Sequence, residues 1–221
     1  MLNKVILWKN LPKPIIEETQ KQFIPIKVKK GQFLYKIGEE PTGIFIIEKG
    51  LMGLIYYGAK GSEHLLRVFK SGQVMGHRSL FSKEKYHGSA IAMEDTLIYK
   101  INKDVICNLI RKHSEIAFVV IESLALDLRR SEEKLVALTD ADVFTRVASA
   151  VYFIKEIYPD HKWTRKEIAS FCGSTTATVI KTLAEFEKQG LIEQTGREIN
   201  ILDKRNYCRN LSQPYSGIFM C

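Results

Sequence analysis

The sequence contains no uninterrupted apolar run of 18 or more residues, which argues against a helix that spans a membrane. The start of the chain, MLNKVILWKNLPKP, has neither the long apolar segment nor the small-residue cleavage site of a secretion signal. We therefore expect a cytoplasmic protein that has no membrane partner.

Cysteine is scarce, and its spacing excludes the common disulfide and metal frameworks. The four cysteines form no CxxC pair and show no metal-ligand spacing. We therefore predict no metal site and expect reduced thiols, as is usual in the cytosol. Cys107 and Cys172 lie in apolar stretches, which favours a role as small core residues for both.

The residue patterns of common enzyme sites are also missing. We find no GxxxxGK(S/T) loop for phosphates, no nucleophile paired with a base and no pair of carboxylates in a plausible cleft. Internal repeats and low-complexity segments are absent as well. We therefore expect a protein that is not an enzyme.

The composition is that of a basic globular protein. Lysine and arginine number 33 against 25 acidic residues, which gives a net charge of +8 and a pI of about 9.2. The 221 residues, 45% of them hydrophobic, suit two small domains that each build a core. The positive charge favours a polyanionic partner, although a basic surface also serves solubility alone.

The N-terminal half has the pattern of a small β domain. Residues 11–23 predict a short helix, and from about residue 24 to residue 101 short β-like runs alternate with turn residues every eight to twelve positions. This spacing is typical of a barrel or sandwich. We predict a sensor domain over 1–102 with an eight-stranded jelly roll, also called a double-stranded β-helix. The clearest runs are 32–35, 43–47, 53–57, 64–69, 89–92 and 97–101.

From about residue 103 to residue 138 the pattern becomes helical. Apolar positions recur at alternating spacings of four and three, which is the a/d seam of a coiled coil. We predict a dimerisation helix over 103–139; the alternative is that the stripe packs on the β domain. The seam residues are Ala117, Ile121, Leu124, Leu128, Ser131, Leu135 and Leu138.

The C-terminal part predicts a winged helix over 140–207. Residues 139–142 carry capping side chains and predict a hinge, and a helix should follow over 144–157. Two short helices then meet at Gly173, where a tight turn favours the absence of a Cβ. The first should run over 165–171, and Ser174 or Thr175 should cap the second. The inward residues of this pair are Ile168, Val179, Leu183 and Phe186.

The outward residues of the second helix indicate double-stranded DNA as the partner. A helix start with small polar side chains and a following lysine suits the major groove, although an ordinary pair of packed helices would show a similar pattern. A β-hairpin with a Thr-Gly turn should follow, and Lys204 comes shortly after it. We predict that Thr175, Thr176, Thr178 and Lys181 face bases, and that Arg165, Lys166, Arg197 and Lys204 contact phosphates. Residues 208–221 are expected to form a tail or a small docking strand.

A glycine-punctuated β-roll, a seam helix and a winged helix, in this order and size, resemble the Crp/Fnr family of bacterial transcription regulators. The resemblance covers about residues 11–205, and its most specific segments are TRKEIASFCGSTTATVIKTLAEFEKQGLI at 164–192 and GEEP and IFIIEKG within 38–50. It implies an α+β fold and a homodimer that binds a palindromic operator and touches RNA polymerase, as an activator would. It also implies a signal that is sensed in the roll and relayed along the seam helix.

The resemblance also indicates where an effector would bind. In cyclic-nucleotide-binding members, a Glu before a short helix holds the ribose and a later Arg neutralises the cyclic phosphate. Here His77 stands in the place of the Glu and Gly88 in the place of the Arg. Losing that Arg should cost roughly 1.5–3 kcal/mol or more, so we do not expect cyclic AMP to bind in the usual mode. Candidate effector residues are Gly76, His77, Arg78, Ser79, Ser89, Ala90 and Ser131, and Arg78 could substitute for the missing Arg.

Other branches of the family differ in what they sense. The iron–sulfur sensors need an N-terminal cysteine cluster, and residues 1–106 contain no cysteine. A haem-based gas sensor of the same fold is an alternative, because His77 or His87 could be an axial ligand; both also fit structural roles. The other alternative is an effector-binding interaction module that works without DNA.

The second helix of the pair departs from the best-known members as well. Thr176 and Ala177 replace an Arg-Glu pair, and Lys181 replaces a later Arg that reads guanine. Lysine can still contact guanine, while threonine and alanine suit thymine methyl groups. We therefore predict an operator different from the usual palindrome of the family.

Overall fold

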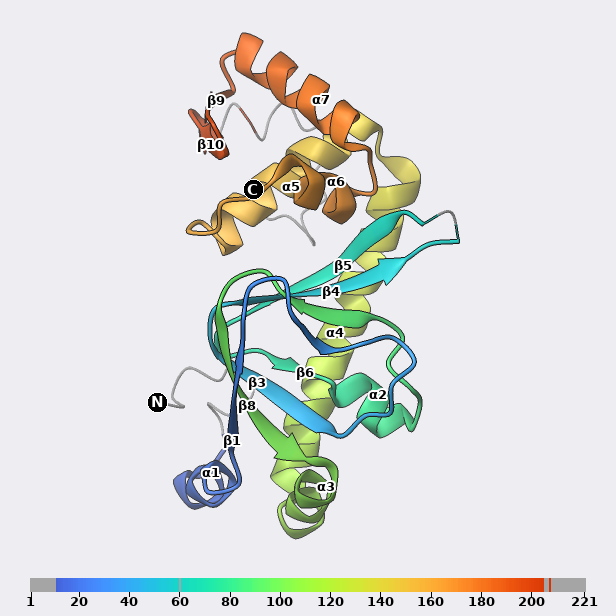
Figure 1. Ribbon diagram of the computed structural model, residues 1–221, viewed down its shortest axis with the longest axis vertical. Helices are drawn as coiled ribbons and strands as arrows, with labels where there is room; N and C mark the ends of the chain where they lie inside the picture. The colour runs from blue at the N-terminus through green and yellow to red at the C-terminus, as the bar shows by residue number, and fades with distance from the viewer. Residues whose placement is uncertain (1–10, 60, 205–206, 208–221) are drawn as a thin grey trace. The chain divides into compact units, whose positions relative to one another are not determined.

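The computed structural model describes residues 11–59, 61–204 and 207. The chain divides into two compact units, Met1–Leu126 and Asp127–Cys221 (Figure 1). The boundary between these units lies inside a single long helix. In the part of the chain that the structure describes, no helix is both long and apolar enough to cross a membrane. The predicted tail at 208–221 lies outside the described residues.

The first unit is a roll of two four-stranded antiparallel sheets, with strand orders β1-β8-β3-β6 and β2-β7-β4-β5. The predicted jelly roll is therefore confirmed. The β-like runs named from the sequence omit two strands. Strand β1 contains Pro25 and lies at a sheet edge, where proline is tolerated, and strand β6 has only two residues. The elements are α1 (Lys13–Gln20), β1 (Ile24–Val28), β2 (Phe33–Tyr35), β3 (Gly43–Lys49), β4 (Leu51–Tyr57), β5 (Glu63–Lys70), β6 (Val74–Met75), α2 (His77–Ser82), β7 (Ser89–Ala92) and β8 (Thr96–Asn102).

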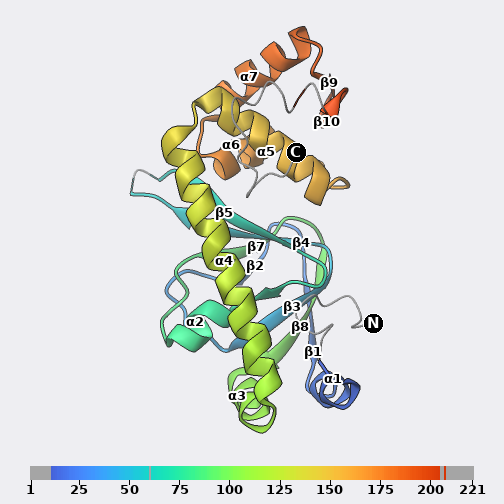
Figure 2. The same cartoon turned by 180° about the vertical axis from the view of Figure 1, so that it is seen from behind.

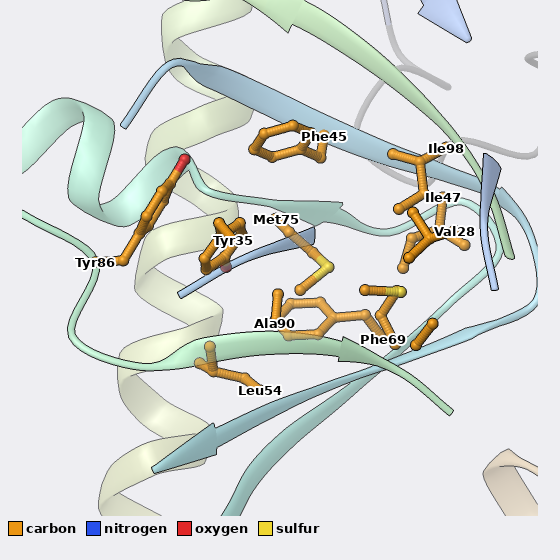
Figure 3. Close-up of a cluster of buried hydrophobic side chains, with 12 residues drawn as sticks. Val28, Tyr35, Phe45, Ile47, Leu54, Phe69, Met75, Tyr86, Ala90 and Ile98 are labelled. Atoms are coloured by element: carbon orange, nitrogen blue, oxygen red, sulfur yellow. The ribbon is translucent and has the colours of Figure 1, made fainter. Parts of the chain in front are cut away.

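Strand β3 is buried on both of its faces, because successive side chains of a strand point to opposite sides. Phe45 and Ile47 enter a cluster inside the roll (Figure 3). Ile44 and Ile46 enter a second cluster, which Leu11 and the helices after the roll complete. The burial of both faces explains why β3 is continuously apolar instead of alternating between apolar and polar residues.

The predicted dimerisation helix over 103–139 is not one continuous helix, because the structure divides it at His113. This residue has an extended backbone, with φ −130° and ψ 93°, and separates α3 (Lys103–Lys112) from α4 (Ser114–Asp140). Ile106 and Ile116 are buried in the second cluster, so α3 and the beginning of α4 pack on the roll. Both views show this part of α4 beside α3 (Figures 1 and 2).

Farther along α4 the seam is exposed. Ile121, Leu128 and Leu135 are 59%, 61% and 62% exposed. The alternative of packing on the β domain therefore holds for the start of the helix, but these three side chains remain accessible.

The second unit is a winged helix, as predicted. It contains α5 (Val143–Ile157), α6 (Arg165–Cys172), α7 (Thr176–Lys188) and the antiparallel hairpin of β9 (Ile192–Thr195) and β10 (Glu198–Ile201). Asp142 caps α5, because its carboxylate accepts a hydrogen bond from the Thr145 amide at 2.7 Å. The core side chains include Val147, Val151, Ile154, Ile168, Val179, Leu183, Phe186, Ile199 and Tyr207.

Candidate DNA-binding surface and effector site

The turn between α6 and α7 is defined by local hydrogen bonds and one glycine. Thr164 and Glu167 form a capping box: the Thr164 hydroxyl accepts from the Glu167 amide at 3.1 Å, and the Glu167 carboxylate accepts from the Thr164 amide at 2.7 Å. Gly173 ends α6 at φ 65°, in the left-handed region that favours glycine. A Cβ there would also lie 3.2 Å from the Leu138 side chain. The predicted turn is therefore confirmed, and its backbone angle and its close contact with Leu138 both favour glycine.

Two of the four proposed base contacts, Thr175 and Thr178, hold the beginning of α7 together. Thr175 is the N-cap, and its hydroxyl accepts from the Thr178 amide at 3.1 Å. The Thr175 and Thr178 hydroxyl oxygens lie 2.8 Å apart. Both hydroxyls therefore hold the helix start; Thr175 is also exposed, whereas Thr178 is half-buried.

The outer face of α7 carries the side chains most available to a groove. Thr176, Ala177 and Lys181 are exposed, as the sequence predicts. Ile180 is 52% exposed on the same face and is missing from the predicted site. The helical period could have identified it, because position 180 follows Thr176 by four residues. An exposed isoleucine beside Lys181 has the kind of apolar surface that suits a thymine methyl group.

The hairpin is attached to both helices through Gln194. The Arg165 guanidinium of α6 donates to the Gln194 side-chain oxygen at 2.6 Å, and also to the carbonyls of Gly196 at 3.2 Å and Arg197 at 3.3 Å. The Glu187 carboxylate of α7 accepts from the Gln194 amide at 2.7 Å and from its side-chain nitrogen at 3.0 Å. Arg165, predicted as a phosphate contact, therefore positions the hairpin.

The other proposed phosphate contacts differ in their surroundings. Lys166 and Arg197 are exposed, with Arg197 in the hairpin turn. Lys204 forms an ion pair with Glu156, and the hydrogen bond that its ammonium donates to that carboxylate raises the pKa of Lys204. The ammonium of Lys204 is therefore paired with a carboxylate of α5.

Replacing Gln194 with alanine should loosen the hairpin while the three helices remain folded. Two side-chain hydrogen bonds are lost, each worth about 0.5–1.5 kcal/mol, so we expect DNA affinity to fall roughly threefold to tenfold on operator and random DNA alike. Fluorescence anisotropy with both DNAs would measure this. Asn200→Ala on β10, which removes an exposed amide, is the matched control and should have little effect. A loss confined to the operator would contradict the role of the hairpin in phosphate binding.

In the roll, the predicted effector residues begin at a constrained turn. Gly76 has φ 82°, and a Cβ on it would lie 3.0 Å from the Gly43 carbonyl oxygen and 3.1 Å from Phe45. His77 and Ser79 on α2 are 4% and 6% exposed. The side chains of His77 and Ser79 face the interior of the unit. Arg78, which lies between them at the start of α2, is exposed to solvent.

Arg78 lies beside the segment that contains Gly88, the position where cyclic-nucleotide-binding members have an arginine. Its guanidinium contacts the imidazole of His87, one residue before Gly88. Burial and the charge of Arg78 both lower the pKa of His87. The structure therefore brings one arginine to this part of the roll, from α2.

Gly88 itself has little room for a side chain, because its neighbours would have to move by a few tenths of an ångström. A Cβ there would lie 3.0 Å from the Ile55 carbonyl oxygen and 3.2 Å from the Leu54 side chain. The next two residues serve the sheet: the Ser89 hydroxyl accepts from the Ile37 amide at 3.0 Å, and Ala90 is fully buried. An arginine could not replace Gly88 without a shift of β4.

Two tyrosines fill the neighbouring interior of the roll. The rings of Tyr35 and Tyr86 stack with their centroids 3.7 Å apart, and Figure 3 shows them beside Phe45. Burial raises the pKa of both hydroxyls, most strongly that of Tyr35. The sequence gives no sign of this pairing, because an aromatic residue in a β-like run indicates only a core position.

Ser131, the last predicted effector residue, belongs to the second unit. Its hydroxyl donates to the Asp127 carbonyl at 2.9 Å within α4. The structure therefore brings together Gly76, His77, Arg78, Ser79, Ser89 and Ala90 in the roll, and places Ser131 on α4 with its hydroxyl bonded to its own helix.

Comparisons with known proteins agree with this architecture. The family model described as a cyclic nucleotide-binding domain matches residues 25–113, and the model described as a Crp-like helix-turn-helix domain matches residues 145–206. The chain belongs to the Crp/Fnr family of transcription regulators. It is a DNA-binding transcription regulator with an effector-binding domain, in a family of regulators rather than enzymes.

Relatives within this Crp/Fnr family differ in the effectors that their names give. A CRP-like cAMP-activated global transcriptional regulator of Mycobacterium tuberculosis is 26% identical over 198 residues, covering 86% of this chain and 88% of that protein. The structure of the c-di-GMP responsive global regulator CLP of Xanthomonas campestris has a TM-score of 0.78 at 15% identity, covering 87% of this chain and 100% of that one. A Crp/Fnr-family regulator of Eubacterium rectale has a TM-score of 0.77 at 18% identity, covering 96% and 100%. The two structures show the shared fold.

Proposed function

We propose that this regulator acts in the bacterial cytoplasm as a homodimer that binds a palindromic operator through α7. The observation that carries the proposal is the exposed face of α7, with Thr176, Ala177, Ile180 and Lys181 outward and Val179 and Leu183 buried behind them. The exposed seam of α4 supports the dimer, because two copies would place two such helices on two half-sites. Contact with RNA polymerase would follow from the mode of action of the family.

We further propose that the effector of the roll is not cyclic AMP bound in the usual mode. Gly88 lies against the Ile55 carbonyl, and the stacked Tyr35 and Tyr86 fill the neighbouring interior. The cation near this place is Arg78, which approaches from α2 beside His87. An effector would bias a two-state change about the hinge at residues 139–142.

Selection of bound sequences from random duplex DNA tests the proposal directly. Purified protein at moderate salt, without added ligand, should enrich a two-fold palindrome that differs from the usual operator of the family. Enrichment without ligand would also show that DNA binding does not require an effector. Absence of enrichment, both alone and with cyclic nucleotides or haem, would favour an effector-binding module that works without DNA.

Lys181→Ala should weaken binding to the selected operator by about 1–3 kcal/mol, because Lys181 would then no longer contact a base edge. Binding to random DNA should change much less, which distinguishes a base contact from a phosphate contact. Lys188→Ala, at the other end of α7, removes the same charge from an exposed position and is the matched control. Equal losses on both DNAs would assign Lys181 to the phosphate backbone instead.

A further inference from the structure

The segment between α2 and β7 places one ring in the interior of the roll. Residues 83–88 form neither helix nor strand, and residues 82–85 and 87 are exposed, whereas Tyr86 is 3% exposed. Lys83 ends α2 with φ 60°, and among the residues that the structure describes it is the one non-glycine residue with a positive φ. We name residues 83–87 the tyrosine lid, because lifting them would withdraw that ring from the roll.

The ring of Tyr86 occupies a flat, apolar space. Its plane is within 14° of that of the Tyr35 ring, and the two centroids are 3.7 Å apart. The Tyr35 ring lies 5.8 Å from the Phe45 ring, and Figure 3 shows the three rings together at one end of the apolar cluster. Offset stacking of this kind stabilises a ring beyond the area that it buries. The place on Tyr35 that Tyr86 fills therefore suits a planar ring.

The tyrosine lid is attached to the exposed turn that follows β2. The Tyr86 amide donates to the Glu39 carbonyl at 2.9 Å, and the Gly38 amide donates to the Tyr86 carbonyl at 2.8 Å. Lys85 and Glu40 form an ion pair at 3.8 Å, and both side chains are largely exposed. Water can replace exposed contacts of this kind, and segments held mainly by them open locally more easily than core strands do.

The contacts between the tyrosine lid and α2 are long or exposed as well. The Glu84 amide donates to the Ser79 carbonyl at 3.2 Å, and the Ser79 hydroxyl donates to the Lys85 carbonyl at 3.4 Å, both at the long end for hydrogen bonds. The contact of Arg78 with the His87 imidazole lies on the exposed side of the lid. The stacked ring is therefore the main buried attachment of the lid.

We propose that the tyrosine lid closes a binding site for a small planar aromatic molecule, whose ring takes the place of the Tyr86 ring on Tyr35 when the lid opens. The ligand should be about the size of a phenol and carry no net charge, because its surroundings are apolar. The proposal rests on the proposed function only in making this molecule the effector of the roll. Its binding is measured without DNA.

Native-state hydrogen exchange of the original protein, followed by NMR, measures the opening of the lid. The Gly38 and Tyr86 amides join the lid to its neighbouring turn, whereas Ile98 is fully buried on β8, between β1 and β3. We expect the first two amides to open at least about tenfold more often than the Ile98 amide, with little dependence on urea. One shared opening rate and urea dependence for all three would mean that only global unfolding releases Tyr86, and the proposal would be wrong.

Isothermal titration calorimetry tests the aromatic site with 4-methylphenol, which is the side chain of tyrosine. Tyr86→Ala leaves the place on Tyr35 open, and this variant should bind one 4-methylphenol per chain. The non-planar 4-methylcyclohexanol should bind roughly threefold to tenfold more weakly, because it cannot stack. The original protein should bind 4-methylphenol at least about tenfold more weakly than the variant, because only the open fraction of the lid admits the ring. Tyr57→Ala removes a tyrosine that is 50% exposed on β4, and should bind no more tightly than the original.

Circular dichroism establishes whether Tyr86→Ala is folded. A folded variant that binds neither probe, binds both equally, or binds 4-methylphenol no more tightly than the original protein would overturn the proposal. If the variant does not fold, the hydrogen exchange of the original protein decides. No DNA is present in either experiment, so a failure of the operator selection would not change these results.

Discussion

Leu128→Glu is expected to convert the proposed dimer into a monomer and to remove its high-affinity binding to the proposed operator. Leu128 is 61% exposed and occupies the central a position of the seam on α4, between Ile121 and Leu135. Burying a leucine contributes about 1.5–3 kcal/mol, and a two-fold dimer loses this contribution twice and gains two buried like charges. Self-association should therefore weaken by roughly two orders of magnitude or more. Light scattering after size-exclusion chromatography would measure the mass.

The control for this change lies on the same helix. Leu126 is 47% exposed, and it lies roughly 200° around the helix axis from Leu128, on the opposite side from the seam. Leu126→Glu introduces the same charge but should leave both the dimer and operator binding intact. If Leu126→Glu abolished the dimer and Leu128→Glu did not, the coiled-coil seam would be the wrong face of α4.

The comparison of the two variants also tests the link between dimer and DNA. A monomer of Leu128→Glu retains an intact α7, so its weak binding to random DNA should persist while its preference for the palindrome disappears. One half-site contributes only part of the base contacts, and two linked half-sites gain affinity through effective concentration. A monomer that kept full operator affinity would show that one copy is sufficient.

Local periodicity explains which parts of the fold could be predicted. The runs around β3, β4, β5, β7 and β8 alternate or are continuously apolar, and the helix pair at 165–188 has clear capping and turn residues, so both domains follow from the sequence. The sequence does not predict the break at His113, because Leu109 and Ile116 on either side of it are seven residues apart, which is two turns of one continuous helix. A spacing pattern indicates which face is buried, and a change of axis direction does not alter it.

The site was harder to predict because its contacts join distant segments. Arg165 has the exposed, basic character of a phosphate contact in the sequence, but it binds Gln194 and the hairpin turn 29–32 residues later. The stacking of Tyr35 on Tyr86 depends on how β2 packs against the segment before β7. Only Ile180 could have been added from the sequence, since the helical period places it beside Thr176 and Lys181.

The second large effect is expected from Lys134→Met, which should stabilise the folded protein at pH 7. Burial lowers the pKa of Lys134 from 10.5 to about 8, and each unit corresponds to about 1.4 kcal/mol. The folded state thus loses up to about 3 kcal/mol by holding the ammonium at pH 7. Because the side chain keeps some contact with solvent, we expect a gain of about 1–2 kcal/mol for the variant. Urea unfolding, followed by circular dichroism, would measure it.

The pH dependence of this gain distinguishes desolvation of Lys134 from better packing of methionine. The folded pKa lies below the unfolded one, so the unfolded chain binds more protons between about pH 8 and pH 10.5, and the stability of the original protein rises over that range. Cys172 acts in the opposite direction, because its raised pKa makes stability fall between about pH 9 and pH 11 in both proteins. The stability difference between Lys134→Met and the original should therefore shrink from pH 8 upward and be small by pH 10.5. A stability difference that stayed constant with pH would assign the gain to better packing of the methionine side chain and not to desolvation of the Lys134 ammonium.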